Sequence, residues 1–267
     1  MDKILKLEPF FSKKVWGYEK WNLSTHPNGE SIVAKNGKDL SSYLGKRLPI
    51  LIKIIKAEES LSVQVHPDDK FARKYEGDNG KTECWYILEA EADATLICGI
   101  KSGLDKESFA EIIKENQIEA YLDSIPVKAG DMVYIPAGTV HAIKGGIKLL
   151  EIQQSSDVTY RLYDWGRNRE MHIQKGIEVI DYRNEHRGGK VEPFSKLETP
   201  YFRVEKVTVC KECHQKSDGF QTLTAISGRG IILTEGEELM LYPEDTVYIE
   251  KGVEYSIKGN LELIRTY

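Results

Sequence analysis

The chain has 267 residues, with 37 Lys and Arg against 42 Asp and Glu and a net charge of −5 at pH 7. Such a chain can bury the core of one large domain or of two smaller ones, and its mixed charge favours neither nucleic acid nor an anionic membrane as a partner. No apolar stretch could span a bilayer, and residues 1–8 lack the apolar segment of a signal peptide, so we expect a cytoplasmic protein. The four cysteines are too few for a disulfide framework.

Most of the chain consists of short strand-like segments separated by Gly, Pro and Asp turns. Helical periodicity is clearest over 105–122, and shorter helices are expected at 67–75 and 171–182. Residues 183–200 are polar and typical of a linker. In chain order, we predict strands at 51–65 with a break at 58–60, and at 95–100, 132–135, 147–153 and 159–163. The pattern predicts a mainly β protein with a few short helices.

An internal repeat is visible in the second half of the chain. Residues 131–145 and 245–259 are identical at about half of their positions. A repeat with so long a period suits a duplicated barrel better than a solenoid. His141 of the first copy corresponds to Tyr255 of the second, so we expect the second copy to be structural.

Three strand-like segments carry residues that can bind a metal: Gln64 with His66, then Glu83, then His141. Gln64 and His66 are two residues apart, so on a strand they point to the same face. Two imidazoles, a carboxylate and an amide with an open position suit a catalytic Zn²⁺, and Fe²⁺, Mn²⁺ or Co²⁺ would also accept these donors. Either histidine alone would be read as a hydrogen-bonded barrel residue, and Gln64 could bind a sugar instead. The four together favour a metal site.

These segments, with residues 9–11, 15–17, 21–31 and 150–165, resemble the type I mannose-6-phosphate isomerases in their short bacterial form. The resemblance implies two cupin barrels, which are double-stranded β-helices, and one Zn²⁺ per chain. It implies a sugar phosphate as the small-molecule partner, with interconversion of mannose 6-phosphate and fructose 6-phosphate. The chain lacks the large helical insertion of the long eukaryotic members.

The resemblance also implies individual roles. Gln64, His66, Glu83 and His141 match the metal ligands of the family. Arg161 matches its active-site arginine, which can hold substrate oxygens and stabilise an enediolate but cannot readily act as a base. From the sequence alone, a surface salt-bridge arginine would be the simpler interpretation.

Three further residues match functional positions of the family. Lys81 matches a lysine near the metal, where an ammonium beside a dication could transfer protons. Its alternative interpretation is a solvated turn lysine. Ser62 and Arg167 match positions that hold the substrate phosphate, for which the guanidinium fork of arginine is well suited.

We therefore predict a catalytic cupin domain at 1–182, a linker at 183–200 and a degenerate second cupin domain without metal ligands at 201–267. The predicted function is a metal-dependent aldose–ketose isomerase that works through an enediol, with Lys81 or a metal-bound water as the base. The alternatives are a non-catalytic sugar-binding or regulatory metal cupin and an isomerase of a related sugar phosphate. A binding module has less need of both Arg161 and Lys81. The patterns leave the oligomeric state open.

The segment from Cys210 to His214 reads Cys-Lys-Glu-Cys-His, which is formally a haem-attachment pattern. Attachment of that kind needs an exported chain, and a structural zinc would need a second pair of ligands. We expect the segment to enter a hairpin without a function of its own. No phosphate-binding glycine motif follows a strand, so a nucleotide cofactor is not indicated.

Overall fold

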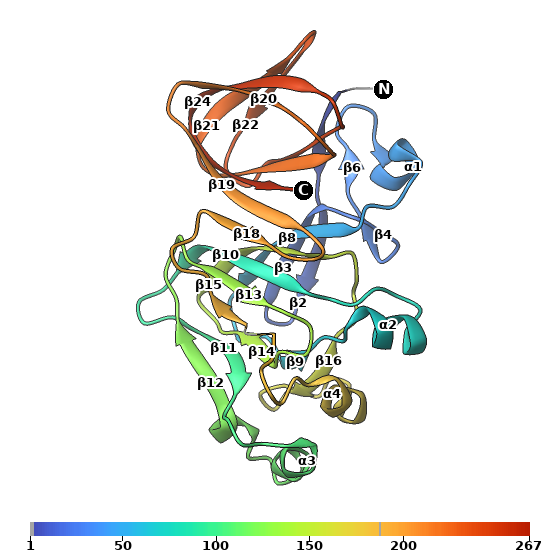
Figure 1. The fold of residues 1–267 in the computed structure, drawn as a ribbon, viewed down its shortest axis with the longest axis vertical. Coiled ribbons are helices and arrows are strands. Elements are labelled where there is room, and N and C mark those ends of the chain that lie inside the picture. Colours follow the sequence, from blue (N-terminus) through green and yellow to red (C-terminus); the bar gives the residue numbers. More distant parts are fainter. Residues whose placement is uncertain (1–2, 187) are drawn as a thin grey trace. The chain divides into compact units, whose positions relative to one another are not determined.

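The computed structural model describes residues 3–186 and 188–267. Over these residues the chain is mainly β, as predicted, with 24 strands, four α-helices and one 3₁₀ helix (Figure 1). None of the described helices is long and apolar enough to cross a membrane.

The chain divides into two compact units. The central unit comprises residues 12–19 and 55–192, and the terminal unit comprises the residues up to 11, 20–54 and 193–267. The boundaries fall within strands β2 (Phe10–Lys14), β3 (Gly17–Leu23) and β8 (Ile50–Ala57). Residues 20–54, which the sequence analysis assigns to the first domain, therefore group with the C-terminal part of the chain.

Two antiparallel sheets build the central unit (Figure 1). One has the strand order β17-β13-β10-β15-β8-β3-β2, and the other has the order β12-β11-β14-β9-β16. Their strands are β9 (Val63–Val65), β10 (Glu83–Ala90), β11 (Thr95–Ile100), β12 (Leu122–Pro126), β13 (Met132–Ile135), β14 (His141–Ile143), β15 (Ile147–Gln154), β16 (Tyr160–Tyr163) and β17 (Gly189–Lys190).

An apolar core lies on the inner faces of these two sheets. Trp85 and Ile87 of β10 and Leu149 of β15 pack there with Leu96 of β11 and Ile143 of β14. Because side chains alternate along a strand, the polar residues Glu83, Glu151 and Gln153 also point inward. The interior is thus apolar along most of its length and polar at one end.

A second apolar cluster covers the outer face of the smaller sheet. Val63 and Val65 of β9 pack there with Phe109 of α3 (Lys106–Lys114) and Ile177 of α4 (Ile173–Val179). Since the two valines point outward, Gln64 between them points inward, as the alternation predicts.

The predicted helices are present but shorter. The helix expected at 67–75 is α2 (Asp69–Tyr75), capped by the Asp68 side chain. The one expected over 105–122 is divided into α3 and the 3₁₀ helix η1 (Ile118–Tyr121), because Asn116 between them adopts a left-handed φ of 57°. The linker expected at 183–200 contains two short strands, β17 and β18 (Lys196–Glu198), which pair with β13 and β19.

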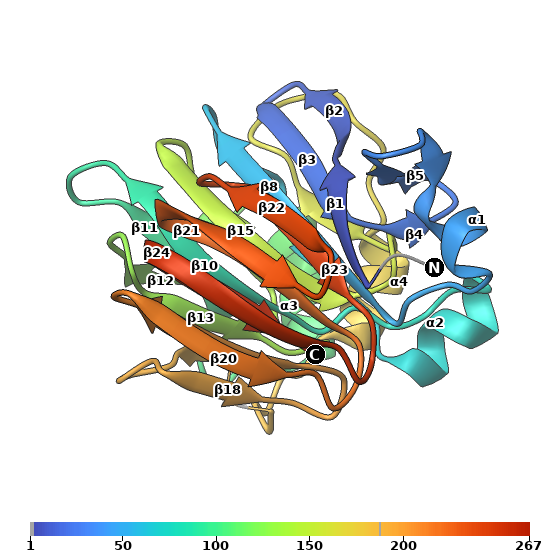
Figure 2. The ribbon, with the colours of Figure 1, turned by 90° about the horizontal axis from the view of Figure 1, so that it is seen from above.

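The terminal unit contains a larger antiparallel sheet, in which the N-terminal strand β1 (Ile4–Glu8) pairs with β23 (Thr246–Ile249). A long antiparallel pair of β21 (Gln221–Thr234) and β24 (Glu254–Thr266) forms its centre, and the two strands lie side by side in Figure 2. The remaining elements are β4 (Thr25–His26), β5 (Gly29–Glu30), β6 (Ile32–Val33), β7 (Lys38–Asp39), α1 (Leu40–Leu44), β19 (Arg203–Val209), β20 (Glu212–Lys216) and β22 (Glu237–Leu241).

The segment with the haem-like pattern does not form a hairpin. Strands β19 and β20 both pair with β24, so residues 210 and 211 interrupt a single edge of the sheet. Cys210 is exposed and Cys213 is half-buried against the core. The expectation of a hairpin at this point was wrong.

The internal repeat is a repeat of structure. Asp131 Oδ2 accepts a hydrogen bond from the backbone of Lys128, and Asp245 Oδ2 accepts the equivalent bond from Tyr242, both at 3.0 Å. The turn that follows each strand ends on a left-handed glycine, Gly138 or Gly252. Both units therefore contain the same strand–turn–strand segment.

Candidate active site

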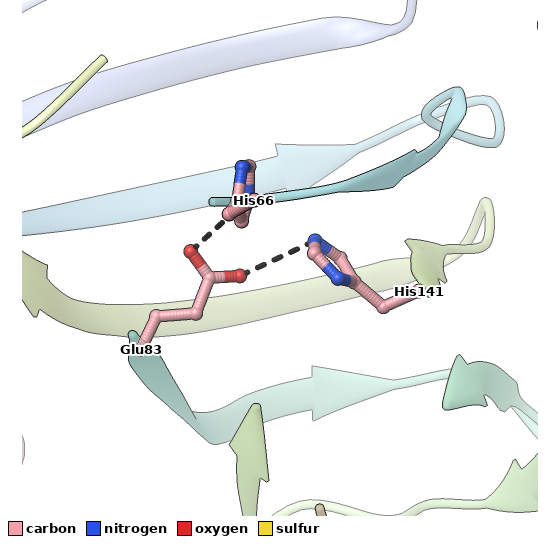
Figure 3. Close-up of side chains that lie close together, drawn as sticks. All are labelled: His66, Glu83 and His141. Atoms are coloured by element: carbon pink, nitrogen blue, oxygen red, sulfur yellow. Dashed lines mark ion pairs between the residues drawn. The ribbon is translucent and has the colours of Figure 1, made fainter. Parts of the chain in front are cut away.

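His66, Glu83 and His141 meet at the polar end of the central unit. All three are buried, and their potential ligand atoms lie within 4.8 Å of one another. His66 follows β9, whereas Glu83 and His141 begin β10 and β14. Figure 3 shows the carboxylate between the two imidazoles: Oε2 lies 3.6 Å from Nε2 of His66, and Oε1 lies 3.5 Å from Nε2 of His141.

The backbone fixes the orientation of both imidazoles. Nδ1 of His66 lies 2.8 Å from the carbonyl oxygen of Val158, and Nδ1 of His141 lies 2.8 Å from that of Thr139. A carbonyl oxygen only accepts, so each Nδ1 carries a hydrogen, and in a neutral ring the lone pair is then on Nε2. Burial lowers the pKa of His141 to about 4, which keeps this ring neutral at physiological pH. Two imidazoles that can offer Nε2, together with a carboxylate, fit a divalent cation.

Gln64 and Arg161 share the inner face with the ligand set. Gln64 is directly opposite His141 on β14 and directly opposite Arg161 on β16. Directly opposed residues of antiparallel strands project to the same side of a sheet. Gln64 Nε2 lies 3.3 Å from His141 Nε2, and Arg161 is half-buried and donates to the carbonyl oxygen of Glu170. The strand register thus brings together all four predicted ligands and the predicted arginine.

Lys81 lies inside the site and is not the solvated turn lysine that the sequence also allowed. Its side chain is 5% exposed, and Nζ lies 2.5 Å from Glu83 Oε2 and 3.1 Å from His66 Nε2. The ammonium therefore contacts the same atoms that would bind a metal.

Glu151 was missed by the sequence analysis. This buried residue of β15 places Oε1 3.9 Å from Lys81 Nζ, and its Oε2 accepts a hydrogen bond from the Trp85 indole at 3.1 Å. Its neighbour Gln153 is directly opposite Glu83. Polar residues alternating with Leu150 and Ile152 in an otherwise apolar strand were the signal that could have identified both.

The two predicted phosphate-binding residues are linked through Ser60, two residues before Ser62. Ser62 is buried and donates to Gln64 Oε1 at 3.3 Å. Arg167 donates to the carbonyl oxygen of Ser60 at 2.5 Å and to Asp164 Oδ1 at 3.0 Å. The turn after β16 is thereby joined to the segment before β9.

Arg169, which the sequence analysis also missed, binds the same carboxylate through Nε, 2.7 Å from Asp164 Oδ2. Burial, together with the positive charges of Arg169 and Arg167, lowers the pKa of Arg161 from its usual value. Arg167 and Arg169 thus both bind the buried carboxylate of Asp164, and Nη1 of Arg167 also lies 3.6 Å from Oε2 of the exposed Glu59.

The terminal unit has replaced the whole ligand set. Gln221 pairs with Ile249 as Glu83 pairs with Ile135, and Gln215 pairs with Tyr255 as Gln64 pairs with His141. Gln221 Nε2 donates to the Tyr255 hydroxyl at 2.8 Å. Among the described residues, only the central unit brings three such ligands together. The strand register assigns a counterpart to each of these positions: Gln215 to Gln64, Gln221 to Glu83, Tyr255 to His141, and Arg265 to Glu151.

Comparison with known proteins agrees with this geometry. The family model for the catalytic domain of type I phosphomannose isomerase matches residues 12–102. The mannose-6-phosphate isomerase of Streptococcus mutans is 32% identical over 100% of this chain and 99% of its own length. The solved mannose 6-phosphate isomerase from Bacillus subtilis superposes with a TM-score of 0.89 at 29% identity and covers 100% of both chains.

A solved mannose 6-phosphate isomerase bound with zinc and yttrium has the same fold, with a TM-score of 0.79 at 14% identity over 100% of this chain and 99% of that chain. The fold is therefore the predicted cupin architecture. The chain belongs to the type I mannose-6-phosphate isomerase family, because it matches the family model, resembles the Streptococcus protein over its full length and shares the fold of the Bacillus enzyme.

Proposed function

We propose that the chain interconverts mannose 6-phosphate and fructose 6-phosphate with one Zn²⁺ held by His66, Glu83, His141 and Gln64. The observation that carries this proposal is the position of Lys81, a buried amine in contact with two of the ligand side chains and close to Glu151. A protein that only binds a sugar does not need a titratable amine there. An isomerase does, because it must move a proton between two carbons.

The donor set supports zinc, and a related isomerase has been solved with this metal. Two imidazoles and a carboxylate leave an open position on a four-coordinate zinc, and with Gln64 also bound the substrate would enter as a fifth ligand. When bound, the cation supplies Lewis-acid stabilisation of the charge that develops on the substrate carbonyl oxygen.

Lys81 is assigned to proton transfer between C1 and C2 of the sugar. A positioned acid–base group contributes about a hundredfold to ten-thousandfold to the rate. Glu151 lies beside the amine, and the bond from Trp85 fixes one of its oxygens while the other faces Lys81. The two residues thus form an acid–base pair within the low-dielectric interior.

Arg161 is assigned to the substrate oxygens. It faces inward between Tyr160 and Leu162, which pack in the outer cluster, and its register places it beside Gln64. A guanidinium remains charged at neutral pH, so it stabilises the enediolate as a hydrogen-bond donor and not as a base.

Ser62, Arg167 and Arg169 are assigned to the substrate phosphate. Arg167 and Arg169 are each about one-quarter exposed, so their guanidinium groups are within reach of a ligand in solvent. Their forks match the geometry of phosphate oxygens. Asp164 holds both side chains in place.

The test is a turnover assay on zinc-loaded protein in deuterated water. We expect conversion of mannose 6-phosphate to fructose 6-phosphate, incorporation of solvent deuterium at carbon, and loss of both on chelation with recovery on added Zn²⁺. A zinc-loaded protein that binds mannose 6-phosphate without converting it would instead support a sugar-binding function.

A further inference from the structure

Three consecutive backbone amides around Lys81 are each held by a separate acceptor. The amide of Gly80 donates to Asp69 Oδ1 at 2.8 Å, and that of Lys81 donates to the carbonyl oxygen of Pro67 at 3.0 Å. The amide of Thr82 donates to Gln154 Oε1 at 2.9 Å. The backbone that carries the proposed proton-transfer group is therefore fixed on both sides of that residue.

The two side-chain acceptors are bonded to each other. Gln154 Nε2 donates to Asp69 Oδ1 at 2.9 Å, so this single oxygen accepts from both Gln154 and Gly80. Asp69 begins α2, three residues after His66, whereas Gln154 ends β15, three residues after Glu151. The pair therefore links the start of α2, near His66, to the end of β15, near Glu151, and both residues bind the segment that carries Lys81.

Gly80 shows how closely this segment packs on the start of α2. A Cβ atom at this position would lie 2.5 Å from the backbone nitrogen of Asp69 and 2.6 Å from the carbonyl carbon of Asp68. Backbone atoms cannot move aside as the end of a flexible side chain can. Only glycine allows the approach at which the Gly80 amide reaches Asp69.

We propose that Asp69 and Gln154 are positioning residues for the isomerase reaction, which hold the Lys81 amine at its reacting position without contacting the metal or the substrate. This inference rests on the role proposed above for Lys81. Displacement of a reacting group by about 1 Å can lower a rate by about a hundredfold. Loss of either side chain should therefore act on kcat, with little effect on KM or on zinc content.

The variants that test this are Asp69→Ala and Gln154→Met, each of which removes the acceptor and keeps the rest of the site. We expect kcat to fall by about tenfold to a hundredfold in both. Asp69→Asn retains an Oδ1 acceptor for Gly80 and should recover most of the lost turnover.

Arg73→Ala is the matched control. Arg73 Nη2 binds the other oxygen of the same carboxylate, Asp69 Oδ2, at 3.0 Å on the protein surface. Its removal perturbs Asp69 but leaves both acceptor bonds in place, so turnover should be unchanged.

Hydrogen–deuterium exchange of the zinc-loaded protein gives a readout that does not depend on activity. Amides 80–82 should exchange faster in Asp69→Ala and Gln154→Met than in the wild type and in Arg73→Ala, while the exchange of β10 stays unchanged. Wild-type kcat in both folded variants, or an equal loss in Asp69→Asn and Asp69→Ala, would overturn the inference.

A Lys81→Met variant separates this inference from the proposed function. If Lys81→Met retained wild-type turnover, the role proposed for the amine would fail, and the positioning inference with it. If Lys81→Met lost turnover while Asp69→Ala and Gln154→Met kept it, only the positioning inference would fail.

Discussion

Lys81 and Glu83 form a buried ion pair at the start of β10, with 2.5 Å between Nζ and Oε2. The same ammonium lies 3.1 Å from His66 Nε2, so its positive charge faces two of the proposed metal ligands. Two like charges a few ångströms apart repel by several kcal/mol at the effective dielectric of a protein site, which is about 20. A bound cation and the ammonium therefore oppose each other.

This opposition makes a prediction for Lys81→Met. The variant should bind Zn²⁺ about tenfold more tightly or better than the wild type, because a positive charge has been removed next to the ligands. It should nevertheless lose turnover. Competition with a chelator of known affinity measures the first effect, and Lys128→Met, at an exposed lysine paired with the buried Asp131, is the control. Weaker zinc binding in Lys81→Met would contradict the prediction.

The second prediction is for His141→Ala, which should lose metal and turnover together. The variant leaves Glu83 and His66 without their third partner, and no other histidine of the described residues belongs to this cluster. We expect about one zinc per wild-type chain by metal analysis and well below that in the variant. His214→Ala removes an exposed histidine of the terminal unit and should retain the full metal content. Full zinc content in His141→Ala would show that the ligand is assigned wrongly.

Arg161→Ala should separate binding of the metal from catalysis. The guanidinium acts on the substrate, so zinc content should stay unchanged while kcat falls by about a hundredfold to a thousandfold, as when a donor to a developing oxyanion is removed. Arg183→Ala, at an exposed arginine of the same unit, is the control. Wild-type turnover in Arg161→Ala would exclude the role proposed for this residue.

Much of the site could be predicted from local patterns. Alternation placed Gln64 inward and its neighbouring valines outward, and the repeat identified Tyr255 as the counterpart of His141. Glu151 was within reach of the same reasoning, because it alternates with apolar residues along β15.

The remaining features depend on contacts between distant parts of the chain. Asp69 and Gln154 are 85 residues apart in sequence, and neither lies in a recognisable motif. The pairing of β1 with β23 is likewise invisible locally, and for that reason the grouping of residues 20–54 and of those up to 11 with the C-terminal part was not predicted. Register between distant strands is decided by packing of the whole sheet and not by the composition of either strand.

Asp164 should make the central unit less stable at acid pH than at neutral pH. Burial raises the pKa of this carboxyl. The hydrogen bonds and charges of Arg169 and Arg167 lower the pKa by more than burial raises it, so the net shift is downward. The folded protein thus holds the carboxylate more tightly than the unfolded chain, whose pKa is about 3.9. The stabilisation is complete above that value and is lost as pH falls through the lower pKa of the folded state.

Asp164→Asn should therefore lower the free energy of unfolding by about 1.5–3 kcal/mol at pH 7, and by progressively less as the pH falls below about 3.9. Urea unfolding of the wild type and the variant at several pH values measures the difference. Asp123→Asn, at an exposed aspartate of β12 in the same unit, is the control. A difference between wild type and Asp164→Asn that stays constant down to pH 3 would show that the pairing with the arginines is not its origin.

The last prediction is that the polar end of the terminal unit is structural. Its interior is filled by its own side chains: Gln221 donates to Tyr255, and Arg265 binds Gln215 at 3.2 Å and Glu205 at 2.6 Å. These side chains bind one another, and among the described residues none of them belongs to a cluster of metal ligands. Tyr255→Phe removes one buried hydrogen bond and should cost about 1–3 kcal/mol of stability while zinc content and turnover stay unchanged.

Ile249→Ala provides the comparison. This fully buried residue packs in the apolar core of the same unit, so its truncation should lower stability by about 2–5 kcal/mol, again with one zinc per folded chain. Thermal unfolding and metal analysis of both variants test the expectation together. Because the ligands of the central unit form one cluster by themselves, damage to the terminal unit should reach the site only through unfolding. A second metal that titrates separately, or lost catalysis in well-folded Tyr255→Phe, would show that the terminal unit takes part in the chemistry.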